Sequence, residues 1–426
     1  MLDLETIEEL IQSYFDKVYQ RVKLKENNEE IIEEIVNKII EENNIIEETN
    51  FNLSQIHFIN NHVKNKIYKM EKDLLTLFEN KKNTLTNLDK LLKLELPEQR
   101  SKEWYELRDT MLTASSLADA IGKGHFKTRT DLLIEKSSKE PPPRFGNAIT
   151  EWGVMYEPVA TTFYEKLNNL EVLEFGLVPH PEFKIFGASP DGICSQKSPE
   201  DYVGRMLEIK CPPKRKFTKE VPEHYWMQMQ GQLECCDLEE CDFLQVKIEE
   251  YQNKEEYLED SNDPSVQGKT SKDFPKGLVL SFITNKNGET KYHYEYSEFY
   301  KSLDEIEKWS YKTILNHTDN YDTVKYHWWR IERYECTLVL RDKDWWNKIM
   351  PEILNFWEDV EHYRKVGNQE LIDKKEEKRN KRKKNKEEKE KTKKSKPKKE
   401  TKNIITINQE ISTEINNNYL LGSESE

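Results

Sequence analysis

The sequence predicts an α/β fold in which a mixed central sheet is flanked by helices, with a helical region before it and a disordered basic tail after it. From Pro97 onward, segments with apolar residues at the helical period follow segments in which apolar and polar residues alternate. Aromatic residues make up 11% of the chain and are concentrated after residue 100, where they can build a core. The expected strands lie near 171–178, 183–187, 206–210, 241–248, 277–283 and 289–295, and the expected helices near 113–121, 150–167, 222–236, 297–315 and 343–364.

The first region, residues 1–95, is rich in Glu, Asn, Ile, Leu and Lys and has apolar residues at helical spacing. Asn-Asn pairs near 27–28, 43–44 and 60–61 predict breaks between several helices. We interpret the region as an accessory region for self-association or for a partner protein. The codon usage of an A/T-rich genome, which favours Lys, Asn, Ile and Glu, explains the same composition equally well.

The most informative residues lie in two short segments near the middle of the chain, 186–193 and 206–212. Asp191 stands in a Pro-Asp-Gly sequence that is typical of a tight turn. Glu208 and Lys210 stand in a segment that alternates apolar and charged residues, as a half-buried strand does, so they share one face of that strand. Two carboxylates can bind a hard divalent cation, and a lysine can stabilise developing negative charge. The segments therefore contain the components of a metal-assisted phosphodiester hydrolase.

A simpler interpretation is a turn aspartate and a surface Glu/Lys pair without chemistry. An isolated Glu-x-Lys on a strand is nearly always such a pair. The combination is more specific, because Ser-Pro-Asp-Gly is followed by Leu-Glu-Ile-Lys-Cys-Pro, with Glu208 17 positions after Asp191. Pro212 then ends the strand, since proline cannot donate to a ladder.

A third carboxylate can come from the segment 152–163, whose apolar residues form one helical stripe. Glu157 lies beside this stripe, where the helix would meet its sheet, and Pro158 should start or kink the helix there. From the residues alone, Glu157 is better explained as a solvated helix glutamate than as a metal ligand. Glu151 and Glu165 are equally good candidates.

An anion site is predicted before the acidic segments. Arg108 can make charge-assisted hydrogen bonds to phosphate oxygens. Ser115 precedes an apolar helical run, so its hydroxyl and the free N–H groups of a helix start can bind an anion, although it can also be an N-cap and nothing more. Gln228 and Gln230 lie on a predicted helix from about 222 to 233, and their amides can bond a scissile phosphate or water.

Several separated motifs occur in one order along the chain. They are Glu-Trp-Tyr-Glu-Leu-Arg (103–108) with Leu-Thr-Ala-Ser (112–115), Gly-Val-Met-Tyr-Glu-Pro-Val-Ala (153–160) with Phe-Tyr-Glu (163–165), Ala-Ser-Pro-Asp-Gly (188–192), Leu-Glu-Ile-Lys-Cys-Pro (207–212) and Tyr-Trp-Met-Gln-Met-Gln (225–230). In this arrangement the chain resembles the YqaJ-like viral recombinase nucleases, the family of lambda exonuclease within the restriction-endonuclease-like, PD-(D/E)xK superfamily. The resemblance is strong over roughly 97–250, weaker to about 365, and does not cover the first 95 residues or the tail.

The resemblance implies a restriction-endonuclease-like core and a role for each site residue. Asp191, Glu208 and the backbone carbonyl of Ile209 would bind Mg²⁺ or Mn²⁺, and the pattern Gly-x-x-x-Glu-Pro selects Glu157 as a further metal-site residue. Lys210 would position or activate the attacking water. Arg108 and Ser115 would bind a terminal 5′-phosphate of DNA. Gln228 is the first choice for contacting the scissile phosphate or water, and Gln230 is the second.

The resemblance also implies a 5′→3′ exonuclease that acts on duplex DNA ends in viral recombination, repair or genome processing. A homo-oligomer, such as the ring-shaped trimer of some family members, and a single-strand-annealing partner protein are further expectations. Two alternatives stay open: an endonuclease or RecB-like repair nuclease with the same core, and a non-catalytic DNA-binding scaffold. Arg108 and Ser115 count against the first, and the intact acidic set counts against the second. The composition together with the family indicates a large DNA virus.

Charge is segregated along the chain, whose formal net charge is −14. Residues 374–402 carry 17 Lys and Arg against 6 Glu, which leaves 49 Lys and Arg against 74 Asp and Glu elsewhere. We divide the chain into the helical region 1–95, a nuclease domain at 97–368 and a basic low-complexity tail at 369–426, which we expect to be disordered. Within the tail, 381–384 can direct nuclear entry or bind phosphates, and a solubilising role is an equal alternative.

The remaining features bear on location and packing. Six cysteines without a C-x-x-C pair indicate reduced thiols, and none precedes Cys194, which argues against the iron–sulfur cluster of some relatives. The chain start lacks an apolar signal segment and no apolar run approaches membrane-spanning length, so we expect an intracellular protein of the host cytoplasm or nucleus without a membrane partner. Residues 251–275 are expected to form a polar surface loop. The Trp-Trp pairs at 328–329 and 345–346 are expected to pack the core, with DNA stacking as the alternative.

Overall fold

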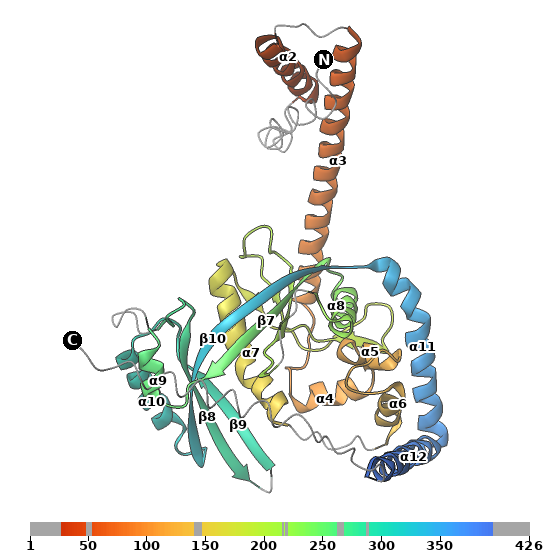
Figure 1. Ribbon diagram of the computed structural model, residues 1–426, viewed down its shortest axis with the longest axis vertical. Helices are drawn as coiled ribbons and strands as arrows, with labels where there is room; N and C mark the ends of the chain where they lie inside the picture. The colour runs from red at the N-terminus through yellow and green to blue at the C-terminus, as the bar shows by residue number, and fades with distance from the viewer. Residues whose placement is uncertain are drawn as a thin grey trace, which may run out of the picture. The chain divides into compact units, whose positions relative to one another are not determined.

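A mixed sheet of seven strands, flanked by helices, forms the centre of the computed structural model, as the sequence predicts (Figure 1). The strands are β1 (Leu112–Thr113), β2 (Val172–Leu173), β3 (Val178–Pro179), β4 (Phe186–Ala188), β5 (Gly192–Cys194), β6 (Met206–Lys210), β7 (Glu240–Glu250), β8 (Lys276–Lys286), β9 (Glu289–Tyr296) and β10 (Thr323–Leu340). The seven-stranded sheet has the order β2-β5-β6-β7-β10-β8-β9, in which β6 and β7 are parallel and the other neighbours are antiparallel. A smaller sheet has the order β1-β4-β3.

Within the described residues the chain divides into two compact units, one made of residues 27–136 and 147–360 and the other of 137–139 and 361–394. The structure describes residues 27–47, 53–139, 147–214, 217, 220–261, 268–286 and 289–394. The helices are α2 (Asn28–Glu47), α3 (Leu53–Leu91), α4 (Lys102–Asp109), the 3₁₀ turn η1 (Ala114–Ser116), α5 (Leu117–Ala120), α6 (Arg129–Ser137), α7 (Ala148–Asn168), α8 (Glu223–Cys236), α9 (Lys254–Glu259), α10 (Leu303–His317), α11 (Lys343–Val366) and α12 (Gln369–Lys394). None of the helices in these ranges is long and apolar enough to cross a bilayer.

The helices beside the sheet begin and end at specific polar residues. The Asn147 side chain accepts hydrogen bonds from the first backbone N–H groups of α7, and Asn169 ends the helix in the left-handed conformation, with φ 50°. Ser302 and Glu305 form a reciprocal capping box at the start of α10. These caps satisfy backbone groups that a helix end would otherwise leave unpaired.

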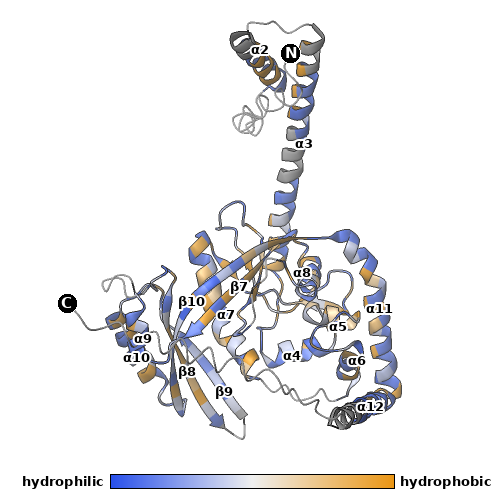
Figure 2. Cartoon of the chain, in the orientation of Figure 1, coloured by the Kyte–Doolittle hydropathy of each residue, from blue (hydrophilic) through white to orange (hydrophobic). Residues whose placement is uncertain are grey.

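The two faces of the large sheet are covered by different helices. Helix α7 buries Tyr156, Val159 and Phe163 in a core cluster that also contains Leu207 of β6 and Leu244 of β7. On the opposite face, α10 contributes to a second apolar cluster with β8. Figure 2 shows the hydrophobic stretches of β7 and β8 between these layers. The sheet is thus the rigid layer that carries the strand-borne residues described below.

The helical character of the first region is confirmed for its described part. Isoleucines of α2 and α3 form a buried cluster: Ile31, Ile32, Ile35, Ile39, Ile59 and Ile67, with Val36 and Val63. The expected breaks at 43–44 and 60–61 are wrong, because α2 and α3 continue through them. Near the end of α3, Asn87 Nδ2 donates to the backbone and carboxylate oxygens of Asp237 at 2.8 Å each. Residues 1–26 lie outside the described residues.

Two elements of the fold differ from the sequence prediction. The longest strand, β10, was not predicted, because a register shift between Ile331 and Arg333 interrupts the period-two pattern on which strand prediction depends. The expected polar loop at 251–275 contains α9, which begins where Asn253 Oδ1 accepts the Glu256 N–H. The predicted core role of the tryptophan pairs is confirmed for Trp328, Trp329 and Trp346, which are buried.

The start of the basic tail also differs from expectation. Residues 369–394, predicted to be disordered, form α12. Lys, Glu and Arg have high intrinsic helix propensity, and Glu370 pairs with Lys374 one turn later, so the helix needs no apolar face to form. Residues 395–426 lie outside the described residues.

Candidate active site

The pairing of β5 with β6 brings the two strand-borne carboxylates together. Gly192 on β5 lies opposite Leu207 on β6, so Asp191, just before β5, is in register with Glu208. Asp191 Oδ2 accepts the backbone N–H of Ile209 at 2.7 Å, which fixes the carboxylate beside the middle of β6. The turn and the strand predicted from the sequence therefore meet as expected.

Glu208 is completely buried, and both of its carboxylate oxygens are hydrogen-bonded. Oε1 accepts the ammonium of Lys210 and, at 2.8 Å, the side-chain amide of Gln228. Oε2 accepts the amide of Gln232 at 2.7 Å. Contact between Glu208 and Lys210 shows that they share one face of β6. The expected contact of Gln228 with the scissile phosphate or water stays a prediction, and in the structure its amide donates to Glu208.

Gln232 is a site residue that the sequence analysis missed. It lies four residues after Gln228 on α8, so both amides reach the same carboxylate from one helix face. Its Nε2 also approaches the backbone oxygen of Ser189 at 3.3 Å, and its Oε1 is a buried atom without a hydrogen-bond partner. The helical spacing from Gln228 was the signal that could have identified it.

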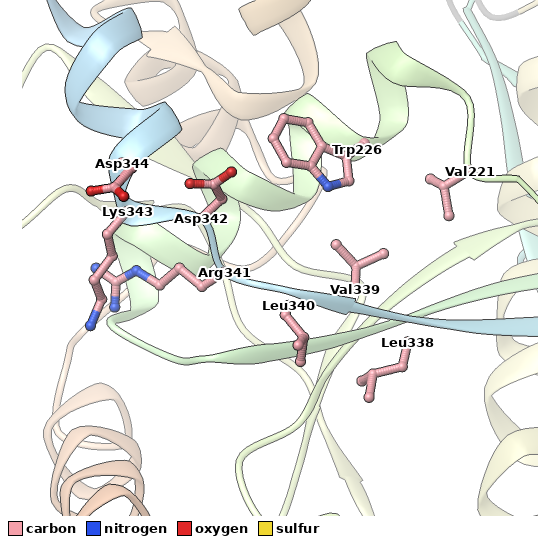
Figure 3. Close-up of a pocket in the computed structure, with 9 residues that line it drawn as sticks. All are labelled: Val221, Trp226, Leu338, Val339, Leu340, Arg341, Asp342, Lys343 and Asp344. Atoms are coloured by element: carbon pink, nitrogen blue, oxygen red, sulfur yellow. The ribbon is translucent and has the colours of Figure 1, made fainter.

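The predicted role of Gln230 in DNA binding disagrees with its position. Gln230 is completely buried, its Nε2 donates to the Leu340 carbonyl at 2.8 Å, and its Oε1 accepts the Asp342 N–H at 2.6 Å. It therefore joins α8 to the junction of β10 and α11, because a residue two positions from Gln228 points to a different face of the helix. A surface hollow of about 670 Å³ lies at this junction; Figure 3 shows its lining residues, Val221, Trp226, Leu338, Val339, Leu340, Arg341, Asp342, Lys343 and Asp344.

Glu157 comes to the site from α7 and is held by an arginine that the sequence analysis did not consider. Both oxygens of Glu157 lie 2.9 Å from the guanidinium of Arg100. Pro158 does not start the helix, since α7 begins ten residues earlier at Ala148. Of the other candidates, Glu165 accepts the backbone N–H of Val172 at 2.8 Å and has a structural role.

The charges of the site perturb one another strongly. Burial, with the charges of Glu208 and Glu157, raises the pKa of Asp191 well above its ordinary value. Burial also raises the pKa of Glu157, and Arg100 offsets part of that rise. Burial alone would lower the pKa of Lys210, but Glu208 and then Asp191 outweigh burial and raise it. Three acidic side chains, Asp191, Glu157 and Glu208, are thus accompanied by two basic ones, Lys210 and Arg100. A bound cation would offset the excess of negative charge.

Arg108 and Ser115 form a polar pair next to these acids. The Arg108 guanidinium donates to Ser115 Oγ at 3.2 Å and stacks on the ring of Trp104 at 4.4 Å. Trp104 in turn donates from Nε1 to Ser189 Oγ at 3.1 Å, which links the arginine to the turn before Asp191. Ser115 lies inside η1 rather than at the cap of an α-helix, so the interpretation as an N-cap alone is wrong.

One cleft of about 520 Å³ joins the acidic and the basic groups. Its lining includes Arg100, Trp104, Tyr105, Arg108, Thr113, Ser116, Glu135, Lys136, Glu157, Asp191, Ile209, Lys210, Cys211 and Tyr225. The oxygens of Asp191, Glu208 and Glu157 and the carbonyl of Ile209 are hard donors of the kind that Mg²⁺ and Mn²⁺ prefer. Within the described residues, one oxygen from each of the three carboxylates cannot be chosen so that all three lie within 4.8 Å of one another. The carboxylate of Glu157 forms an ion pair with Arg100. The donor set therefore fits a cation in its chemistry, and Glu157 is the member that must leave Arg100 or remain at the periphery.

This arrangement, a mixed sheet that carries paired acids and a lysine into a basic-rimmed cleft, agrees with the comparison with known families. Residues 103–239 match the family model of the YqaJ-like viral recombinase domain. Over these residues the chain is therefore similar to that domain, and every site residue predicted from the sequence lies within the matched segment.

Relatives occur among proteins of large DNA viruses. Uncharacterized protein R354 of Acanthamoeba polyphaga mimivirus is 33% identical over 318 residues, which cover 68% of this chain and 57% of that protein. A protein of African swine fever virus, strain Badajoz 1971 Vero-adapted, is 27% identical over 161 residues, which cover 32% of this chain and 46% of that protein. The chain thus spans about half the length of these relatives.

Two solved structures are similar over most of their own length. The alkaline exonuclease LHK-Exo from Laribacter hongkongensis has a TM-score of 0.38 and 20% identity, with 64% of this chain and 99% of that chain covered. A phage-related exonuclease from Haemophilus somnus has a TM-score of 0.32 and 14% identity, with 61% and 96% covered.

Proposed function

We propose that this protein is a metal-dependent nuclease that hydrolyses phosphodiester bonds of DNA. One observation carries the proposal: Asp191 and Lys210 line a cleft that also contains Arg108, and the buried Glu208 contacts Lys210 on the same face of β6. Carboxylates and a lysine in this arrangement provide cation ligands and a fixed positive charge for phosphate chemistry. The viral recombinase domain across the same residues supports DNA as the substrate.

Asp191, Glu208 and the carbonyl of Ile209 would hold Mg²⁺ or Mn²⁺, with Glu157 as a further ligand. A cation at this place would lower the pKa of a bound water and shield charge on the phosphate. Gln228 and Gln232 fix the orientation of Glu208 by bonding one oxygen each. The chain thus orients the ligands before a substrate arrives, which is the condition for strong electrostatic stabilisation of a transition state.

Lys210 is the residue that we assign to the attacking water and to charge on the reacting phosphate. Its ammonium contacts Glu208 and lies 5.1 Å from the centre of the Tyr225 ring, which confines it to the wall of the cleft. Its raised pKa keeps it protonated at neutral pH. A permanently charged lysine stabilises negative charge and orients water, but does not act as a general base.

We further propose that the enzyme acts from DNA ends, in the 5′→3′ direction. Arg108, with Ser115 and Thr113 on the same guanidinium nitrogen, offers a forked cation and two hydroxyl groups to a terminal phosphate. The guanidinium plane stacked on Trp104 is preorganised for that contact. A 5′-phosphate bound there would place the first phosphodiester toward Asp191 and Lys210 in the same cleft.

The experiment that tests the proposal compares linear and closed circular duplex DNA, each with Mg²⁺ and with EDTA. We expect degradation of linear DNA with Mg²⁺ only, faster with a 5′-phosphate than with a 5′-hydroxyl, and resistance of closed circles. Efficient cutting of closed circles would favour the endonuclease alternative. Binding of DNA without any hydrolysis, with either Mg²⁺ or Mn²⁺, would favour the non-catalytic scaffold.

A further inference from the structure

A second cluster of metal-ligating side chains lies on β9 and the last turn of α10. His293 and Glu295 are two residues apart on β9, so their side chains share one face of the strand. His317 closes α10 over the same face. Among the described residues, these three form the one group of at least three His, Cys, Asp or Glu whose ligand atoms all lie within 4.8 Å of one another.

The cluster is separate from the candidate active site. β9 is at the edge of the seven-stranded sheet, four places from β6 in the strand order, or roughly 19 Å at ~4.8 Å per strand. The alternate residues of β9 face the other way: Tyr296 Oη donates to the Met155 carbonyl of α7 at 2.9 Å. His293 and Glu295 therefore lie on the face that α10 covers, opposite to α7.

The three side chains already converge on one oxygen. Nε2 of His293 lies 3.0 Å from Glu295 Oε1, and Nε2 of His317 lies 3.2 Å from the same atom. With metal–ligand bonds of ~2.0–2.2 Å and tetrahedral angles, two ligands of one zinc ion stand about 3.3–3.5 Å apart. The observed separations are close to this value, so a small outward movement would admit an ion between the two imidazole nitrogens and the carboxylate oxygen.

Neighbouring residues hold the two histidines in place. Phe282 of β8 is directly opposite His293 in the strand pairing, and its ring centre lies 4.6 Å from that of His317. The ring of Tyr321 stacks on His293 at 5.7 Å. Ile306 of α10 is buried in one apolar cluster with Leu280 of β8, which holds α10 on this face of the sheet. Such hydrophobic and positional support is what fixes the ligands of a metal site.

We propose that His293, Glu295 and His317 form a binding site for a divalent transition-metal ion of the zinc class. Two imidazoles and one carboxylate are the protein ligands of an open zinc site, in which solvent completes the coordination. Imidazole favours zinc over Mg²⁺, whereas the all-oxygen set around Asp191 favours Mg²⁺ or Mn²⁺. The two sites would thus select different ions, and the bound ion would connect the edge strand β9 to α10.

The test uses full-length protein without a histidine tag, stripped of metal and kept in excess Mg²⁺ so that the acidic cleft does not compete for the probe. Zn²⁺ binding is measured by calorimetry and by metal content after dialysis, and Co²⁺ is titrated to read the tetrahedral absorption of a nitrogen-containing site. We expect one Zn²⁺ per chain in the wild type. His293→Ala and His317→Ala should each weaken Zn²⁺ binding by at least ~10²-fold, more than the loss of an outer-shell partner causes.

The controls distinguish the site from unspecific binding and from misfolding. His362→Ala removes an exposed histidine elsewhere and should leave the Zn²⁺ affinity unchanged. Glu295→Gln keeps the size of the side chain and should weaken binding while the circular dichroism spectrum stays that of the wild type. Equal Zn²⁺ affinity in the wild type and in both histidine variants would overturn the proposal. So would a wild-type protein that takes up no Zn²⁺ in excess Mg²⁺.

Discussion

Replacing Asp191 by asparagine removes one anionic ligand while it preserves the local structure. The amide keeps an oxygen that can accept the Ile209 N–H, now 2.7 Å from Oδ2, and it has the size of the carboxylate. Because one preorganised electrostatic element contributes about 10²–10³ to the rate, we expect kcat on linear duplex DNA to fall at least ~10²-fold, or about 2.7 kcal/mol in transition-state free energy. A smaller loss would mean that the cation is bound elsewhere.

The same substitution should not destabilise the metal-free protein. Burial and the neighbouring acids raise the pKa of Asp191 in the folded state, so the ionised form is less favourable there than in the unfolded chain. At neutral pH a neutral amide removes that cost, and the metal-free variant should have a Tm equal to or above that of the wild type. Loss of activity together with unchanged or higher stability is typical of a residue that serves a ligand rather than the fold.

The assay follows release of a fluorescent nucleotide from a linear duplex at saturating Mg²⁺, with thermal unfolding in EDTA measured in parallel. Glu135→Gln is the matched control, since Glu135 lines the same cleft but pairs with Lys127 rather than with the acidic set. We expect this control to cleave at near wild-type rates. The reasoning is refuted if a folded Asp191→Asn variant cleaves as fast as the wild type, or if Glu135→Gln loses as much activity.

Four further outcomes are expected. Lys210→Ala should lower kcat with little change in KM, because its charge acts on the reacting phosphate; a collapse of DNA binding with normal turnover would instead make it a phosphate anchor. Arg108→Ala should erase the preference for a 5′-phosphate over a 5′-hydroxyl in matched duplexes more than it lowers the basal rate. Arg341→Met should lower the free energy of unfolding in urea by about 3–5 kcal/mol, because Arg341 is 7% exposed and its loss leaves the buried Glu234 unpaired. The control Lys343→Ala, at a position that is 57% exposed, should lower it by less than ~1 kcal/mol. Removal of residues 374–426 should reduce the salt dependence of DNA affinity while cleavage at low salt persists, and identical salt slopes would argue against a DNA contact by the tail.

The acidic pair could be predicted from sequence because its geometry is local. Alternation places Glu208 and Lys210 on one strand face without any tertiary information, and the Pro-Asp-Gly turn places Asp191 at a strand end. The second glutamine beside Glu208 could also be identified locally, as Gln232 rather than the predicted Gln230, but this depends on helical rather than strand spacing. A two-residue motif on a helix directs its members to different faces, so only one glutamine of the pair reaches Glu208.

Arg100 could not be predicted by the same means. It lies 57 residues from Glu157 in the sequence, and its backbone has a left-handed φ of 67°, which is unusual for a residue other than glycine. The contact between Arg100 and Glu157 exists because the segment before α4 brings Arg100 to the cleft that Glu157 also lines. Strand β10 was equally inaccessible to prediction, because a register shift interrupts the alternation, although the strand pairs with β8 over residues 323–330 and with β7 over residues 329–340.

Under the proposed function, the distribution of charge explains how a protein with a negative net charge could act on DNA, which is itself negatively charged. Outside the basic tail, acidic residues far outnumber basic ones, and this disfavours coating of the body with DNA. The cations that do line the cleft, Arg100, Arg108, Lys136 and Lys210, are few and each is held by the protein: Lys136, for example, donates to the Arg108 carbonyl at 2.6 Å. Contacts with DNA would therefore be concentrated at the reacting end of the duplex. There the fixed positive charges of the cleft would lower the activation barrier of hydrolysis rather than strengthen binding of the whole duplex. A nuclease built in this way would depend on the tail, or on a partner, for affinity to long DNA, and on the cleft for rate.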